Sequence, residues 1–107
     1  MNLGAPNAYK ALAEMYEDLG RNSEAKALYD KEAKNGDTKA MFILGMKYSD
    51  ENNFEKAKKM FDMILQKDPK HTDALIEIGM LYKNQKNYKE AEKYYKKAIS
   101  IKKLQDI

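Results

Sequence analysis

Residues 40–61 read AMFILGMKYSDENNFEKAKKMF, and residues 74–95 read ALIEIGMLYKNQKNYKEAEKYY. The two stretches match at a constant offset of 34 positions, in small and aromatic residues. The matching pairs are Ala40 with Ala74, Gly45 with Gly79, Tyr48 with Tyr82, Ala57 with Ala91 and Phe61 with Tyr95. Residues 8–29 match the first of these stretches at an offset of 32. The chain therefore contains three related units, at about 6–37, 38–71 and 72–105, which we interpret as one repeat domain over residues 1–107.

Each unit contains two runs with the apolar periodicity of a helix. The apolar residues recur at steps of three and four, which is the spacing of one helical face. Polar turns containing Asn22, Asn53 or Asn87 separate the runs, and an Asn side chain can accept a hydrogen bond from the start of the next helix. We therefore predict six helices, at about 7–19, 22–35, 38–50, 54–67, 72–84 and 88–103.

Length and composition limit the classes of protein. The 107 residues, 43% of them hydrophobic, suffice for one modest domain. The absence of cysteine excludes disulfides, thiolate zinc sites and a cysteine nucleophile. No apolar run approaches about 18 residues, and the first residues lack a signal-peptide pattern. We expect no membrane span and no signal peptide, which favours the cytoplasm without settling the compartment.

The repeated residues resemble the tetratricopeptide repeat family, whose motif spans 34 residues. The middle unit carries the motif as Leu44, Gly45, Tyr48, Ala57, Phe61 and Pro69. The third unit carries Gly79, Tyr82, Ala91, Tyr95 and Ala98, but Lys103 stands where the family has proline. In the first unit the exit at 29–40 is two residues shorter and resembles a Sel1-like repeat. The resemblance implies an all-α, right-handed α-solenoid of three helix-turn-helix repeats, with about six helices.

Residues that could support catalysis or bind a metal are few. His71 is the only imidazole and lies in the loop after Pro69, without a second histidine or a cysteine nearby in sequence. The five glycines are spread singly, so no phosphate-binding loop is present. Carboxylates on helices of a lysine-rich chain are typical of a solvated surface. We therefore expect no enzymatic activity, no metal and no cofactor.

Basic character increases along the chain. Residues 1–37 hold five basic and seven acidic residues, residues 38–71 hold seven and five, and residues 72–107 hold eight and five, giving net charges of −2, +2 and +3. An RNA-binding helical array is an alternative interpretation of this charge pattern. In it, the lysine-rich C-terminal half would bind the phosphates, and the bases would stack on Tyr88, Tyr94 and Tyr95. Tyr95 is a core position of the repeat and the chain has a single arginine. We therefore expect a solvated surface and no nucleic acid.

The first helix of each unit also carries residues that the repeat does not assign to the core. In the family these positions line a concave groove, and here they are Lys10, Glu14, Glu17, Lys39, Phe42, Met46, Asp73, Ile76, Met80 and Lys83. Ile76 and Met80 form an apolar pair four residues apart, as do Phe42 and Met46, where a solvated face would be polar. Burial by neighbouring helices is the alternative explanation. We predict a non-enzymatic module that binds a peptide or helix of a partner protein in this groove.

A structural array that self-assembles through its ends is the remaining alternative. The last helix presents a series of large apolar residues with no following helix in the sequence to cover them. They are Tyr94, Ile99, Ile101, Leu104 and Ile107. Repeat arrays normally need a polar cap at this position. We expect either that the protein continues beyond this helix or that it self-associates through it.

Overall fold

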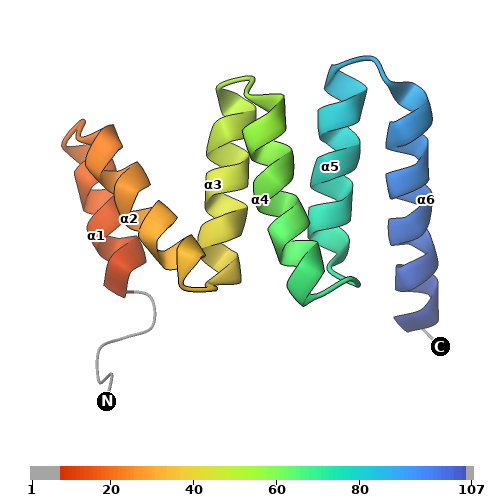
Figure 1. Cartoon of the computed structure of the whole chain (residues 1–107), viewed down its shortest axis with the longest axis horizontal. Coiled ribbons are helices and arrows are strands. Elements are labelled where there is room, and N and C mark those ends of the chain that lie inside the picture. Colours follow the sequence, from red (N-terminus) through yellow and green to blue (C-terminus); the bar gives the residue numbers. More distant parts are fainter. Residues whose placement is uncertain (1–7, 106–107) are drawn as a thin grey trace. The chain divides into compact units, whose positions relative to one another are not determined.

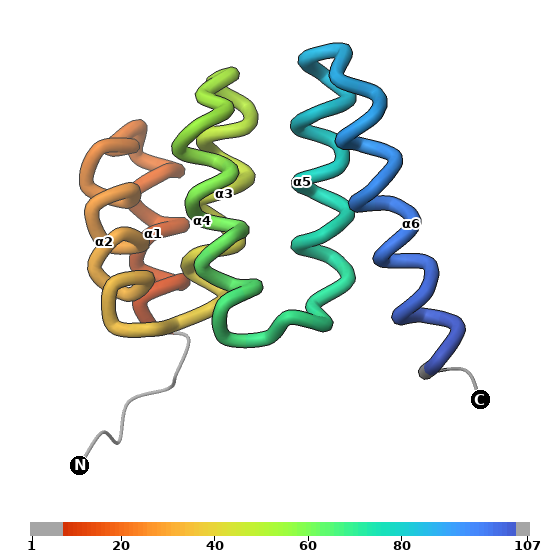
Figure 2. The backbone as a smooth tube through the Cα atoms, turned by 45° about the vertical axis from the view of Figure 1, so that its right-hand side comes forward, coloured from red at the N-terminus to blue at the C-terminus, as the bar shows by residue number. Residues whose placement is uncertain are grey.

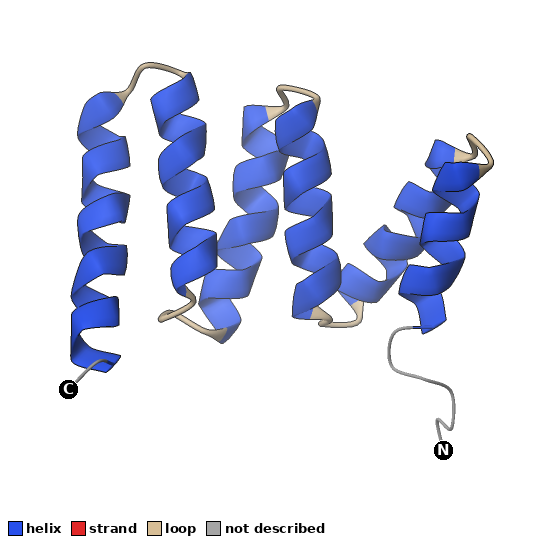
Figure 3. Cartoon of the chain, turned by 180° about the vertical axis from the view of Figure 1, so that it is seen from behind, coloured by secondary structure: helices blue, strands red, loops and turns tan. Residues whose placement is uncertain are grey.

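The computed structural model describes residues 8–105, and all regular secondary structure in that range is α-helical (Figure 1, Figure 3). The helices are α1 (Ala8–Asp18), α2 (Asn22–Lys34), α3 (Thr38–Asp50), α4 (Phe54–Lys67), α5 (Thr72–Asn84) and α6 (Tyr88–Gln105). The predicted fold class, an all-α solenoid of three helix-turn-helix repeats, is confirmed. Helix α6 continues past Lys103, because no proline stops it there. The predicted start at residue 7 and the apolar Ile107 lie outside the described residues.

The turn inside each repeat has the same backbone conformation. Gly20, Asn52 and Lys86 occupy equivalent positions and have φ angles of 77°, 60° and 63°. The next residue in each turn donates its N–H to the carbonyl of a tyrosine five residues earlier, at N···O distances of 2.7, 2.8 and 2.9 Å. This is the Schellman ending of a helix, which requires a left-handed residue and therefore favours glycine. The turn is tolerated with asparagine and lysine at some cost.

Side-chain caps begin the second helices of the last two repeats. The Oδ1 atom of Asn53 accepts a hydrogen bond from the N–H of Lys56 at 3.2 Å, and that of Asn87 accepts one from Glu90 at 3.4 Å. The predicted role of Asn22 is wrong. Asn22 is already inside α2, and Arg21 occupies the cap position without a side-chain cap. In the repeat alignment, residue 21 is equivalent to the capping residues 53 and 87.

Two other side chains cap the first helices of the second and third repeats. The Oδ1 atom of Asp37 accepts a hydrogen bond from the N–H of Ala40 at 3.1 Å. The Nδ1 atom of His71, 34 positions later, accepts one from the N–H of Ala74 at 3.1 Å. His71 thus has a defined structural role as the cap of α5.

The contacts divide the described residues into two compact units, residues 8–44 and residues 45–105. In the first unit, the rings of Tyr9 and Tyr29 pack edge to face with centroids 6.1 Å apart. Ala13, Ala25 and Leu44 are buried. Burial and the neighbouring Asp37 carboxylate raise the pKa of Tyr9 to about 12. The first core therefore has an aromatic centre, surrounded by small and aliphatic residues.

The second unit has a more continuous aliphatic core. Helix α5 packs against both α4 and α6, and the backbone trace shows α5 and α6 side by side (Figure 2). The residues with at most 1% exposure are Ala57, Phe61, Ile64, Ala74, Leu75 and Ile78. They come from the apolar stripes of α4 and α5, as the periodicity predicts.

The two helical glycines accommodate aromatic rings. A Cβ atom on Gly45 would lie 2.6 Å from Cζ of Phe61, and one on Gly79 would lie 2.7 Å from Cε1 of Tyr95. The sequence predicts that these glycines permit close approach of Ala57 and Ala91. The nearest atoms belong instead to the aromatic residues one turn further along, so each glycine provides the space for a ring.

We expect Gly45→Ala to lower the free energy of unfolding by about 1–3 kcal/mol through overpacking, which outweighs its gain in helix propensity. Gly79→Ala should cost less, because Tyr95 is half-buried and its ring can shift, whereas Phe61 is fully enclosed. Urea unfolding of the two variants checks this order. A Gly45→Ala protein more stable than the parent would contradict the assigned contact.

The left-handed turn residue of the third repeat gives a stabilising substitution. Lys86→Gly should raise the free energy of unfolding by about 0.5–1 kcal/mol, because glycine adopts positive φ without the steric cost of a Cβ. Lys97→Gly, in the interior of α6, is the matched control and should instead cost about 1 kcal/mol. Thermal melting of both proteins distinguishes the turn from the helix.

Candidate functional site

The predicted groove residues of the third repeat share one face of α5. Asp73, Ile76, Met80 and Lys83 follow each other at steps of three and four, and all four side chains are exposed. Ile76 and Met80 are 37% and 40% exposed. This face is therefore an apolar strip with an acidic residue near the N-terminus of the helix and a basic residue near its C-terminus.

The other predicted groove residues lie on α1 and α3. Lys10 and Glu14 are exposed on α1, and Glu17 is half-buried. On α3, Lys39 and Met46 are exposed, whereas Phe42 is half-buried. These residues belong to both units of the chain, so one continuous groove over the three first helices stays a prediction.

An open pocket of about 580 Å³ lies between α5 and α6, and we call it the terminal pocket. Its apolar lining consists of Ile76, Tyr95, Ala98 and Ile99. Its polar lining consists of Thr72, Asp73, Lys102 and Lys103. Asp73 and Ile76 thus belong both to the predicted groove face and to this pocket. The volume is in the range of small ligand sites, and the composition is apolar with a charged rim.

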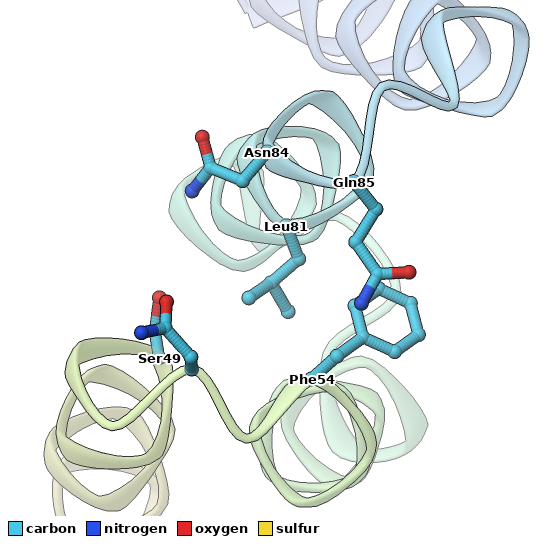
Figure 4. A pocket seen from close by; sticks show the side chains of 6 residues that line it. Ser49, Phe54, Leu81, Asn84 and Gln85 are labelled. Atoms are coloured by element: carbon cyan, nitrogen blue, oxygen red, sulfur yellow. The ribbon is translucent and has the colours of Figure 1, made fainter.

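A second cavity of about 160 Å³ lies where the turns of the last two repeats meet (Figure 4). It is lined by Ser49, Asn52, Phe54, Leu81, Asn84 and Gln85. The figure shows the Leu81 side chain directed into the space between the α3–α4 turn and α5. This cavity is too small for a drug-sized ligand. Its lining residues instead identify side chains of the α3–α4 hairpin that lie near the C-terminal end of α5.

The tyrosines of α6 are mostly engaged within the protein. The ring of Tyr94 stacks on Tyr82 with centroids 5.8 Å apart, and Tyr95 contacts the backbone position of Gly79. Tyr88 is 62% exposed. Of the three residues considered for base stacking, two therefore already take part in packing, which weakens the RNA-binding alternative.

Two carboxylates lie one turn apart on α5. Glu77 is half-buried, and burial together with the nearby Asp73 raises the pKa of its carboxyl group. The desolvated Glu77 and the exposed Asp73 repel each other when both are charged. A basic group placed next to them would relieve this repulsion.

The exposed apolar face of α1 was missed by the sequence analysis. Leu12 follows the apolar periodicity of α1 yet is 39% exposed, and Met15 is 47% exposed. Leu19, which directly follows α1, is 60% exposed. Periodicity identifies an apolar face but does not show whether another helix covers it. Leu12 and Met15 are equivalent to Ile78 and Leu81 of α5, which are at most 5% exposed, so the repeat pattern alone does not predict their exposure.

Within residues 8–105, no group of three or more His, Asp or Glu side chains is arranged to hold a metal ion. In the same range, no helix has the length and apolar character needed to cross a membrane. Along α6, Glu90 pairs with Lys93 at 3.0 Å, and Glu92 pairs with Lys96 at 3.5 Å. Such exposed pairs contribute little to stability, and they are typical of a solvated surface.

Three family models match the chain, and each is described as a tetratricopeptide repeat. They match residues 8–41, 39–71 and 72–103. No curated protein matches the chain. The match to a Sel1-like repeat at the first junction stays a prediction.

Solved structures with the same fold include two of MamA. The crystal structure of MamA is 22% identical with a TM-score of 0.79, and the match covers 94% of this chain and 60% of that chain. An arginine-to-glutamate mutant of MamA is 23% identical with a TM-score of 0.71, and the match covers 89% of this chain and 71% of that chain. These similarities show the fold, and the chain spans about three fifths of the MamA chain in the first of them.

The raised pKa of Glu77 predicts a stabilising substitution that depends on pH. Because the folded state favours the protonated carboxyl, Glu77 contributes less stability as pH rises through and above the ordinary glutamate range, near about 4.3. Glu77→Gln should therefore raise the free energy of unfolding at pH 7, and the gain should disappear below about pH 4. Urea unfolding at both pH values checks this, and an equal gain at both would exclude the electrostatic cause.

Proposed function

Residues 8–103 of this chain are three tetratricopeptide repeats, and we propose that they form a non-enzymatic interaction module that binds a peptide or helix of a partner protein. The proposed binding surface is the exposed face of α5, extended by the equivalent faces of α3 and α1. The ligand is an apolar segment with a basic flank. No cofactor takes part in this proposal.

The observation that carries the proposal is the exposure of Ile76 and Met80. The other large aliphatic residues of α5, Leu75, Ile78 and Leu81, are at most 5% exposed. These three residues therefore form the contribution of α5 to the core, whereas Ile76 and Met80 form apolar surface on a different face of the helix. A contiguous exposed apolar patch often marks a binding surface. Methionine adapts to ligands of different shape.

The charges beside this strip favour a basic flank on the ligand. Asp73 and Glu77 lie one turn apart near the start of α5, and the pKa of Glu77 is raised. A lysine or arginine of the ligand next to them would remove their mutual repulsion. On α1, Glu14 and Glu17 add two further carboxylates at predicted groove positions. Such charges mainly orient the ligand and accelerate its association, while the apolar residues provide most of the affinity.

Selection from a displayed library of random peptides, about 15 residues long, identifies a probe for this surface. We expect enrichment of apolar peptides with flanking Lys or Arg, and dissociation constants in the micromolar range, about −8 kcal/mol. Met80→Glu should weaken binding of the best peptide at least about tenfold, because it places a charge in the apolar strip. Fluorescence anisotropy of the labelled peptide measures the change.

Gln66→Glu is the matched control, since it adds the same charge at an exposed position on α4. It should leave both affinity and thermal melting unchanged. Met80→Glu should also retain the parent's helicity. Unchanged peptide binding by a folded Met80→Glu protein would place the site on another surface.

A further inference from the structure

The residues of α6 that line the terminal pocket have counterparts one repeat earlier on α4, the helix against which α5 packs. Helix α5 packs against α4 within the chain. The apolar residues that α6 contributes to the pocket lie 34 positions after residues of α4. The pairs are Phe61 with Tyr95, Ile64 with Ala98 and Leu65 with Ile99. Lys102 and Lys103 correspond to Asp68 and Pro69, where the chain turns from α4 toward α5. The pocket therefore has the position of a site for another first helix.

Helix α1 has an apolar face that corresponds to the packed face of α5. Leu12 and Met15 lie 66 positions before Ile78 and Leu81, which is the sum of the two repeat offsets, 32 and 34. Ile78 and Leu81 are 0% and 5% exposed, whereas Leu12 and Met15 are 39% and 47% exposed. Helix α1 thus carries the apolar residues of a packed first helix on a face that is open to solvent.

The cavity in Figure 4 indicates which residues would meet if this packing were repeated between two molecules. In that cavity, Leu81 and Asn84 of α5 lie across from Ser49 and Phe54 of the preceding repeat (Figure 4), and Asn52 lines the same cavity. Moving each side by whole repeats gives the equivalent residues at the two ends of the chain. Leu81 and Asn84 become Met15 and Asp18, and Ser49, Asn52 and Phe54 become Lys83, Lys86 and Tyr88.

The side chains at these end positions are complementary. Asp18 would lie near Lys83 and Lys86, and all three are exposed. Met15 would lie near Tyr88, which is 62% exposed, and a thioether packs favourably against an aromatic ring. Over whole helices, α1 has one lysine and three acidic residues, a net charge of −2, and α6 has six lysines and two glutamates, a net charge of +4. Opposite charges of this kind steer association.

We propose that α1 of one molecule docks on the α5–α6 hairpin of a second copy, in the way that α5 packs against α4. The α1 helix of another molecule therefore lies along this hairpin, with Leu12 and Met15 as its apolar contacts, Met15 near Tyr88 and the first turn of α1 toward the terminal pocket. The interface is heterologous, because it joins two different surfaces. Each added molecule brings a new surface of each kind, so the molecules associate head to tail.

Sedimentation velocity of the whole chain between about 10 µM and 1 mM tests the proposal. The weight-average mass of the parent should rise with concentration. Met15→Glu, on α1, and Ile99→Glu, in the terminal pocket, should each weaken self-association at least about tenfold. Ser100→Glu adds the same charge on the next, exposed residue of α6 and is the matched control. Circular dichroism melting establishes that each variant is folded. A parent that stays monomeric over the whole range would overturn the proposal.

Mixing the two variants distinguishes head-to-tail association from a symmetric contact. The Met15→Glu protein keeps an intact terminal pocket, and the Ile99→Glu protein keeps an intact α1 face. The equimolar mixture should therefore form a one-to-one complex with about the parent's affinity, although each variant alone associates at least about tenfold more weakly. Self-association of Met15→Glu at the parent's affinity would show that α6 pairs with α6, and it would refute the role of α1.

A charge exchange tests the register of the contact. Asp18→Lys should weaken association, because it places a cation near Lys83 and Lys86. Lys86→Asp in the same chain should restore it, since an aspartate adopts positive φ more readily than most residues. The parent's association should also weaken as salt is raised, because exposed charges are screened within about 8 Å at physiological ionic strength. Failure of the second substitution to restore association would exclude this register.

Discussion

Each helical hairpin in this protein has more apolar surface than its own two helices can cover. The hairpin α5–α6 shows this most clearly, because α5 is buried by α4 on one side and by α6 on another. Between these two neighbours, Leu75 and Ile78 of α5 are at most 1% exposed. The free energy of folding therefore depends on contacts between repeats as well as on contacts within them. The turns, caps and glycines of each repeat serve to hold the helices in position for those contacts.

The helices could be predicted closely from the sequence, because their signals are local. Apolar periodicity, the Asn-containing turns and Gly36 all act within a few residues, and the predicted bounds differ from the observed ones by at most two positions in the described range. The predicted capping of α2 by Asn22 was wrong, because the cap position of this repeat holds Arg21, whereas the other two repeats have Asn53 and Asn87 there. The contact of Gly45 with the Phe61 ring could not be predicted, because periodicity assigns a face to a residue but does not say which atom of the next helix lies opposite.

The candidate site could be predicted only in part. Exposure of Ile76 and Met80 agrees with the groove prediction, since both lie outside the apolar stripe that packs. Exposure of Leu12 does not follow from the sequence pattern, because the same apolar pattern describes a covered helix and an uncovered one. Nine large apolar side chains are exposed among the described residues, and three of them, Met46, Ile76 and Met80, are predicted groove residues. The other six lie on α1 and α6 or directly after α1: Leu12, Met15, Leu19, Tyr88, Ile99 and Leu104. They form apolar surface at the two ends of the chain, and Ile76 belongs both to the groove face and to the terminal pocket.

The packing of α5 on α4 also has an evolutionary consequence. The residues on the two sides of this contact recur at a fixed spacing of one repeat, so a duplicated hairpin already carries both surfaces that it needs to join the array. Insertion or loss of one whole repeat changes the length of the protein without requiring a new interface. A gene of this kind can therefore vary in repeat number more easily than in the sequence of any single repeat.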